Sequence, residues 1–253
     1  MVKKTKEKSN SKFVRNEFNR QLREDYGDDY EFDRWFKKGS SWQTYRMVYL
    51  NHKHHTKGIK FKNYLEFGVG SGTFTKMFID NQNKFTLIDI SDEMIKQARK
   101  NLGDRKNVKY VVADMANYRT KEKFDFVFGS RVLKYSNNKP KLIRNIYRVM
   151  KKGGVCVMTN QNADTIVQSL KKKLGLKQKE VLHSKDVSIE DYRKMFKEAG
   201  FRNIRFYPAV IKIKLGVFEI NALNNALWKK YHDKEMTPFT KAISGSWLVK
   251  MKK

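Results

Sequence analysis

The 253-residue sequence is poor in cysteine, in acidic side chains and in long apolar runs. Its single cysteine, Cys156, excludes a disulfide within the chain, and its apolar neighbours indicate a buried strand rather than a reactive thiol. No apolar run approaches the roughly 20 residues that a membrane-spanning helix needs. The Lys-rich beginning is not followed by an apolar stretch, so we expect no signal peptide and a cytoplasmic location.

The scarcity of acids leaves a formal net charge of +29, from 55 Lys and Arg against 26 Asp and Glu. A strongly basic surface attracts phosphate-rich partners, so RNA or another anionic surface is one interpretation. The other is an ordinary solvated surface, because the charge is spread along the chain and Lys is a poorer bidentate phosphate ligand than Arg. Composition leaves both open and is silent on the oligomeric state.

The chain divides into three parts. Residues 1–12 are charged and lack periodicity, which predicts a disordered basic tail. Residues 13–58 have apolar side chains at helical spacing, which predicts a helical segment. Residues 59–253 form the main predicted domain, in which 161–244 includes insertions on the substrate side.

From residue 62 onwards, short apolar strands alternate with amphipathic helices. This rhythm predicts a doubly wound α/β fold, a mostly parallel sheet with helices on both faces. Ser91 and Ser188 are predicted N-caps. The expected strands cover 63–67, 85–90, 108–113, 124–129, 155–159, 201–213 and 246–251, and the expected helices include 73–81, 92–102, 140–150 and 215–228.

A glycine-rich turn follows the first predicted strand, with Glu66 two residues before Gly68, and then Gly70 and Gly72. Glycines in such a turn allow a sharp bend and a close approach of backbone amides to a ligand. A dinucleotide-binding loop would place its third glycine at position 73, which is Thr73. The loop is therefore predicted to bind a nucleoside ligand of another kind.

Two carboxylates follow the next two predicted strands. Asp89 ends the second strand, where an acid can accept hydrogen bonds from both ribose hydroxyls. Asp114 follows the third strand, where it can accept from an adenine amino group. Because the carboxyl ends of parallel strands form the ligand-binding edge of such a sheet, the loop and both acids are expected to meet there.

Five segments in order resemble the successive motifs of the class I S-adenosylmethionine-dependent methyltransferases, over about residues 60–160. They are 65–72 (LEFGVGSG), 87–95 (LIDISDEMI), 112–115 (VADM), 124–130 (FDFVFGS) and 148–154 (RVMKKGG). The resemblance implies a Rossmann-like, seven-stranded sheet with one antiparallel strand, formed here by the terminal residues.

The resemblance also implies roles in binding S-adenosyl-L-methionine. Glu66 would lie near the methionine amino group, Asp89 would hold the ribose, Asp114 and Met115 would flank the adenine, and Ser130 would face the methionine portion. Tyr45 and Arg46, on a helix before the sheet, are candidates to cap the cofactor carboxylate. The complete predicted set is Tyr45, Arg46, Glu66, Gly68, Gly70, Gly72, Asp89, Ile90, Asp114, Met115 and Ser130.

No catalytic residue is required by methyl transfer itself, because the sulfonium already makes the methyl group electrophilic and alignment can supply roughly 7–11 kcal/mol. Arg131, Tyr135 and His183 are the candidates for contacting the acceptor or acting as a base. The cluster at His52, His54 and His55 matches no common zinc spacing and is interpreted as solvated, so no metal is expected.

Three functions remain open. The favoured one is O- or N-methylation of a small-molecule, glycan or lipid-type acceptor. The alternative is methylation of RNA, with the basic surface contacting phosphates. The position after the fourth strand reads Gly129-Ser130-Arg131-Val132, without the Asn or Asp and Pro-Pro run of amino-methylating nucleic-acid enzymes, which disfavours that alternative. A non-catalytic scaffold is disfavoured by the intact Glu66, Asp89 and Asp114.

Overall fold

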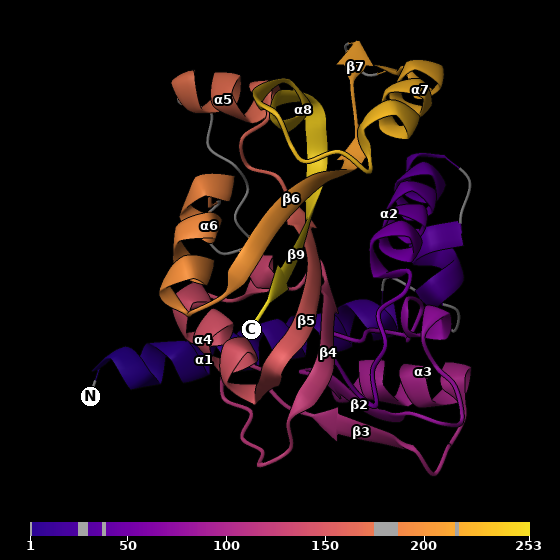
Figure 1. The fold of residues 1–253 in the computed structure, drawn as a ribbon, viewed down its shortest axis with the longest axis vertical. Coiled ribbons are helices and arrows are strands. Elements are labelled where there is room, and N and C mark those ends of the chain that lie inside the picture. The colour runs from indigo at the N-terminus through magenta and orange to yellow at the C-terminus, as the bar shows by residue number, and fades with distance from the viewer. Residues whose placement is uncertain (1, 25–29, 37–38, 175–186, 216–217) are drawn as a thin grey trace.

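The computed structural model describes residues 2–24, 30–36, 39–174, 187–215 and 218–253. A seven-stranded sheet in the order β3-β2-β1-β4-β5-β9-β6 runs through it, which confirms the predicted α/β fold (Figure 1). The strands of this sheet are β1 (Asn63–Phe67), β2 (Lys84–Asp89), β3 (Val108–Val112), β4 (Phe124–Ser130), β5 (Met150–Gln161), β6 (Arg202–Ile211) and β9 (Ser244–Lys252).

The strand directions follow the predicted pattern. β1 pairs in parallel with both β2 and β4, and β3 and β5 extend the parallel part on either side. The terminal strand β9 inserts between β5 and β6 and is antiparallel to both. The single antiparallel strand expected from the terminal residues is therefore confirmed. A separate two-stranded pair is formed by β7 (Lys214–Leu215) and β8 (Phe218–Glu219).

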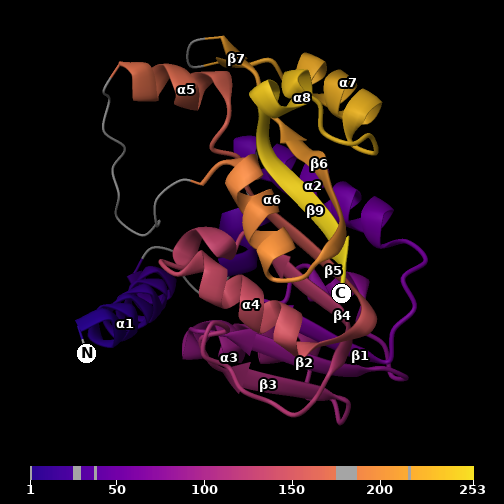
Figure 2. The same cartoon turned by 60° about the vertical axis from the view of Figure 1, so that its left-hand side comes forward.

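Helices cover both faces of the sheet (Figures 1 and 2). Helices α2 (Ser40–Thr56), α3 (Asp92–Leu102) and α7 (Asn221–Tyr231) pack on one face, and α4 (Lys139–Val149) and α6 (Ile189–Glu198) on the other. The remaining helical elements are α1 (Val2–Glu24), the π-helix η1 (Phe32–Phe36), the 3-10 helices η2 (Thr75–Met77) and η3 (Leu133–Tyr135), α5 (Ile166–Lys173) and α8 (Pro238–Ile243).

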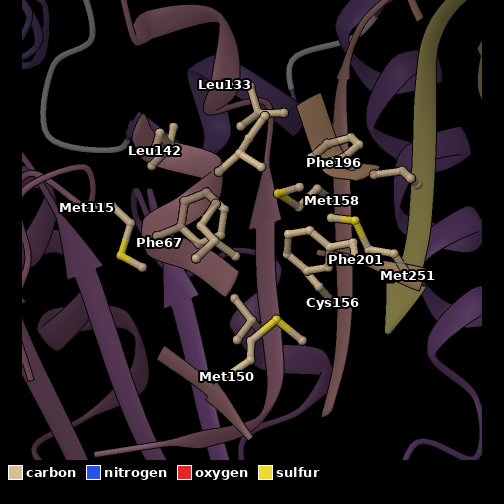
Figure 3. Close-up of a cluster of buried hydrophobic side chains, with 14 of the residues drawn as sticks. Phe67, Met115, Leu133, Leu142, Met150, Cys156, Met158, Phe196, Phe201 and Met251 are labelled. Atoms are coloured by element: carbon tan, nitrogen blue, oxygen red, sulfur yellow. The ribbon is translucent and has the colours of Figure 1, made fainter. Parts of the chain in front are cut away.

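Successive side chains of β1 point to opposite faces of the sheet and enter two different hydrophobic cores. Leu65 and Phe67 enter the core under α4 and α6, whereas Tyr64 enters the core under α2 and α3. Cys156 lies in the first of these cores, between strands and helices, as Figure 3 shows. Burial raises the pKa of its thiol well above the ordinary value, so the side chain is a core residue and not a nucleophile.

Side-chain caps fix where the helices beside the sheet begin. Ser91 accepts a hydrogen bond from the Met94 backbone N–H at the start of α3, and Ser188 accepts one from Asp191 at the start of α6. Both predicted N-caps are thereby confirmed. Such caps typically contribute about 1 kcal/mol each, and they fix the helix that follows Asp89 relative to the end of β2.

Two predicted helices differ from the structure. The helix expected over 73–81 is reduced to η2, because Asp80 accepts from the backbone N–H groups of Gln82 and Asn83 and turns the chain into β2. The helix expected over 215–228 begins only at Asn221, after the β7–β8 pair. Apolar spacing alone did not reveal either turn.

The N-terminal residues also differ from expectation. Residues 2–12, expected as a disordered tail, are part of α1; their Lys-rich sequence contains no glycine or proline that would interrupt a helix. Polar contacts hold α1 against α3: Arg15 and Asn19 both donate to Asp92 Oδ1, at 2.9 Å in each case, and Ser91 Oγ donates to Asn19 Oδ1 at 2.6 Å. The N-terminal segment therefore reaches the edge of the sheet where the predicted site lies.

Two of the three histidines of α2, His52 and His55, were wrongly interpreted as solvated, whereas His54 is exposed as expected. His52 is fully buried, with its ring 4.9 Å from the Phe74 ring and 4.8 Å from the Phe128 ring. Burial lowers its pKa to about 3, so the imidazole is neutral at physiological pH.

Among the described residues, no group of three or more His, Cys, Asp or Glu side chains is arranged to hold a metal ion. Nor does the described part of the chain contain a helix long and apolar enough to cross a bilayer.

Candidate active site

A pocket of about 1400 Å³, its open mouth included, lies at the carboxyl ends of the parallel strands. Its floor comes from the residues that follow β1, β2, β3 and β4, and its cover comes from α1 and from the segment around η1. This is the edge at which open α/β sheets bind their ligands. The sequence predicted this location, but not the cover.

The glycine loop begins the wall of this pocket. Gly68 has φ of +68°, and a Cβ at this position would lie 2.5 Å from Cγ1 of Val132. Gly70 has φ of +56° and open space around it, and its N–H donates to Asp89 Oδ2 at 2.9 Å. Gly72, at φ of +83°, faces Leu102 of α3, not the pocket. Its absent side chain therefore serves the packing of α3 against the loop.

Asp89 connects the loop to α3. It is only 8% exposed, and burial raises its pKa, although the hydrogen bonds from the Ser91 and Gly70 backbones oppose that rise. A carboxylate offers about four lone-pair positions. Gly70 and Ser91 use one on each oxygen, so the group retains capacity for the two hydroxyls of a ribose. The predicted nucleoside-binding role fits this geometry.

Asp114 lies two residues beyond β3, under α1. Its Oδ2 accepts hydrogen bonds from Ser11 Oγ and Asn117 Nδ2, each at 2.7 Å, and its Oδ1 accepts from the Ala116 backbone at 2.9 Å. Ser11 also lines the pocket, as do Val14 and Phe18 of the same helix. Helix α1 therefore covers the part of the pocket that the sequence assigns to adenine.

Glu66 lies beneath the loop, buried and outside the pocket lining. Its Oε2 accepts from Tyr64 Oη at 2.7 Å and from Thr75 Oγ1 at 2.8 Å. Burial raises the pKa of this carboxyl to about 7, and the hydrogen bonds from Tyr64 and Thr75 limit the rise. The geometry shows Glu66 bracing the loop from below; contact with the methionine amino group stays a prediction.

The raised pKa of Glu66 predicts a pH-dependent stability. A carboxyl whose pKa is 4.5 when unfolded and about 7 when folded takes up a proton on folding between those values. It therefore destabilises the fold as the pH rises through that window, by about 3 kcal/mol in total. Relative to wild type, Glu66→Gln is expected to gain that amount between pH 5 and pH 8 in urea unfolding. Parallel pH dependences of the two proteins would contradict this.

The other predicted cofactor residues divide into two groups. Ile90, Met115 and Ser130 line the pocket, and Ser130 Oγ is 3.0 Å from Thr159 Oγ1 of β5. Tyr45 and Arg46 do not line it. Tyr45 instead packs in an aromatic cluster, with its ring 4.9 Å from that of Phe36 and 6.0 Å from that of Phe74; burial raises its pKa to about 12.

The roles of the three acceptor candidates stay predictions, although two of them can be placed. Arg131 and Tyr135 line the pocket after β4, whereas His183 lies outside the described residues. Sequence reasoning missed Arg34 and Trp35 of η1, which line the pocket opposite Arg131. Two further side chains of the lining in this part, Tyr30 and Lys134, were also not predicted.

The segment around η1 is positioned by contacts made far from it in sequence. Glu31, which is buried, accepts from Lys76 Nζ at 2.8 Å just beyond the glycine loop. The Trp35 ring meets the Phe74 ring at a centroid distance of 5.8 Å. These anchors hold Arg34 and Trp35 over the end of β4, and no local pattern in residues 30–36 predicts that placement.

Comparison with known proteins identifies the site. Residues 65–158 match the family described as "Methyltransferase domain". An uncharacterised protein of Methanocaldococcus jannaschii is 30% identical over 183 residues, 72% of this chain and 82% of the relative. Malonyl-[acyl-carrier protein] O-methyltransferase 2 of Ilyobacter polytropus is 26% identical over 53% of this chain, which spans 52% of that relative.

Among solved structures, the N-methyltransferase NodS of Bradyrhizobium japonicum in complex with S-adenosyl-L-homocysteine has a TM-score of 0.57, with 17% identity, and the match covers 94% of this chain and 97% of that one. With the matched domain, the relatives and the sheet order, these findings show that the chain belongs to the class I S-adenosylmethionine-dependent methyltransferases. It is an enzyme whose cofactor is S-adenosylmethionine.

Proposed function

We propose that the protein methylates an oxygen or nitrogen atom of a small-molecule, glycan or lipid-type acceptor by direct in-line transfer. The observation that carries this proposal is the covered pocket, in which residues after all four central strands meet. A concave site in which a few polar side chains converge among apolar ones is typical of small-ligand binding.

Different residues of the pocket would bind the cofactor and position the acceptor. The Gly68–Gly70 turn and Asp89 hold the nucleoside, while Asp114 and Met115 border the adenine. Helix α1 and the η1 segment cover part of the pocket, and reduced access of water would strengthen electrostatic interactions inside it. The bound cofactor supplies an electrophilic methyl group, so the remaining task of the protein is alignment of the acceptor atom near the end of β4.

The matched relatives include enzymes named for O-methylation of malonyl-[acyl-carrier protein] and for N-methylation, which supports acceptors bearing oxygen or nitrogen nucleophiles. We place the catalytic unit at residues 59–253 and the cover in α1 and the η1 segment; the described residues of 161–244, predicted to lie on the substrate side, do not line the pocket. Tyr135, whose ring meets that of Phe18 at 5.1 Å, borders the acceptor part of the pocket.

The test is a transfer assay with S-adenosylmethionine labelled in its methyl group, run on separated metabolite, lipid and RNA fractions of the source cell. We expect label in a metabolite or lipid fraction, and none when the Asp89→Ala variant replaces wild type. Label confined to the RNA fraction, together with an RNA affinity that falls steeply with salt, would replace the proposal with the RNA alternative.

A further inference from the structure

The charges that line the pocket are separated along the sheet. Of the described lining residues, just Asp89 and Asp114 carry carboxylates, and they follow β2 and β3. Arg131, Lys134 and Lys141 line the pocket after β4, and Arg34 lines it from η1. Because β1 lies between β2 and β4, the acidic part and the cationic part occupy opposite ends of the pocket. The two carboxylates match the hydrogen-bond donors of a nucleoside. The role of the cationic side chains has still to be assigned.

Arg131 is held in an unusual backbone conformation at the end of β4. Its φ is +61°, a region that non-glycine residues rarely adopt, and its N–H donates to the Thr159 carbonyl at 2.8 Å. Its Nε is shut off from solvent and has no hydrogen-bond partner among the described residues. A buried, charged donor without a partner is costly, and such groups cluster at sites that a ligand completes.

Arg34 and Arg131 converge on one indole. The Arg34 Cζ lies 4.5 Å from the centroid of the Trp35 ring, and the Arg131 Cζ lies 5.8 Å from it. Burial and the proximity of Arg34 lower the pKa of Arg131 to about 10, so the Arg131 guanidinium remains charged at neutral pH. Burial, Arg131 and Arg34 together lower the pKa of Lys134 to about 7. The fold therefore places basic side chains that repel one another when charged at the end of β4.

The cofactor can balance this charge only in part. Its sulfonium and ammonium groups outnumber its one carboxylate, so it brings net positive charge to the pocket, and that single carboxylate can compensate only one of Arg34 and Arg131. An anion from the second ligand is needed to compensate the other. Guanidinium groups bind planar or tetrahedral oxyanions through paired hydrogen bonds, which suits the fork geometry of Arg34 and Arg131.

We propose that the acceptor carries an oxyanionic group, a carboxylate or a phosphate, which binds between Arg131 and Arg34 beside Trp35. The inference rests on the proposed function, because it assigns the acceptor's anchoring group within that same pocket. Arg131 and Arg34 are then the residues that select the acceptor. Trp35 fixes the two guanidinium groups and packs against the apolar part of the molecule.

The test uses the full chain saturated with S-adenosylhomocysteine and titrated with inorganic phosphate or with acetate. Dissociation constants are measured for wild type, Arg131→Met and Arg34→Met. The matched control is Arg205→Met, an exposed arginine of β6 outside the pocket lining. We expect one oxyanion to bind wild type and Arg205→Met alike. Either pocket variant should bind it about 10-fold or more weakly, as the loss of a charge-assisted hydrogen bond implies. The oxyanion that binds more tightly identifies the acceptor's group.

A second measurement excludes the cofactor's own carboxylate as the partner. S-adenosylhomocysteine affinity should stay within about threefold of wild type in both pocket variants. The proposal is overturned if Arg131→Met weakens S-adenosylhomocysteine but not 5′-methylthioadenosine, which lacks the amino-acid portion. It is equally overturned if neither oxyanion binds wild type, or if both pocket variants bind it normally. Should Arg131→Met fail to fold, Arg34→Met decides. Failure of the proposed function would be seen separately, as no methyl transfer to any fraction despite intact oxyanion binding.

Discussion

Asp89→Ala is expected to weaken S-adenosylhomocysteine binding about 100-fold or more. The wild-type carboxylate has two lone-pair positions left after its bonds to Gly70 and Ser91, and a ribose would use both. Hydrogen bonds to charged groups contribute about 1.5–3 kcal/mol each, so losing two corresponds to at least this factor. Isothermal titration calorimetry of the full chain measures it directly.

The control must separate binding from folding, because Asp89 also holds the loop and the start of α3. Asp104→Ala removes an exposed aspartate that pairs with Arg99, outside the pocket. It should leave cofactor affinity unchanged. Asp89→Asn keeps one accepting oxygen and should fall between the two. An Asp89→Ala protein that unfolds cooperatively yet binds with wild-type affinity would show that Asp89 does not touch the cofactor.

Gly68→Ala is expected to lower the free energy of unfolding by about 2–5 kcal/mol. The new Cβ would lie 2.5 Å from Val132 Cγ1, at a φ of +68°. Left-handed backbone costs roughly 1–2 kcal/mol for a residue with a side chain, and overpacking adds typically 1–3 kcal/mol. Chemical denaturation reports the sum.

The chain offers a matched control for this second prediction. Gly70 also has a positive φ, +56°, but a Cβ added there would meet nothing within 4 Å, so Gly70→Ala should show only the backbone cost of about 1–2 kcal/mol. Adding Val132→Ala to Gly68→Ala should recover part of the lost stability by removing the Cγ atoms. Equal losses at Gly68 and Gly70, or no recovery in the double variant, would refute the steric argument.

The sequence revealed the strands best where local pattern and motif coincide. The predicted 63–67 is the observed β1, because an apolar run ends there in a glycine turn. β5 begins at Met150, five residues before the predicted 155, because α4 passes directly into it and 151–154 continue the strand. The antiparallel direction of β9 was predicted from the family resemblance, but its place between β5 and β6 was not, since its partners are distant in sequence and no local pattern encodes them.

The site follows the same division. The nucleoside half was predictable, because Asp89 and Asp114 follow strands whose ends must meet at one edge of a parallel sheet. The acceptor half was not, because Arg34 reaches the end of β4 through the Glu31–Lys76 pair and the packing of Trp35. Tyr45 was predicted to contact the cofactor, but its side chain packs against aromatic rings and does not line the pocket.

The hydrogen bond from Ser11 to Asp114 ties α1 to the acid that the sequence assigns to adenine. Asp114 Oδ2 accepts from Ser11 and Asn117, whereas Oδ1 accepts one hydrogen bond, from Ala116, and keeps a lone pair for an adenine amino group. A nucleoside that contacts the docked helix would be linked to it reciprocally: it would hold α1 in place by the same factor with which the docked helix tightens nucleoside binding. The position of the N-terminal helix would then bear on how long the product stays bound.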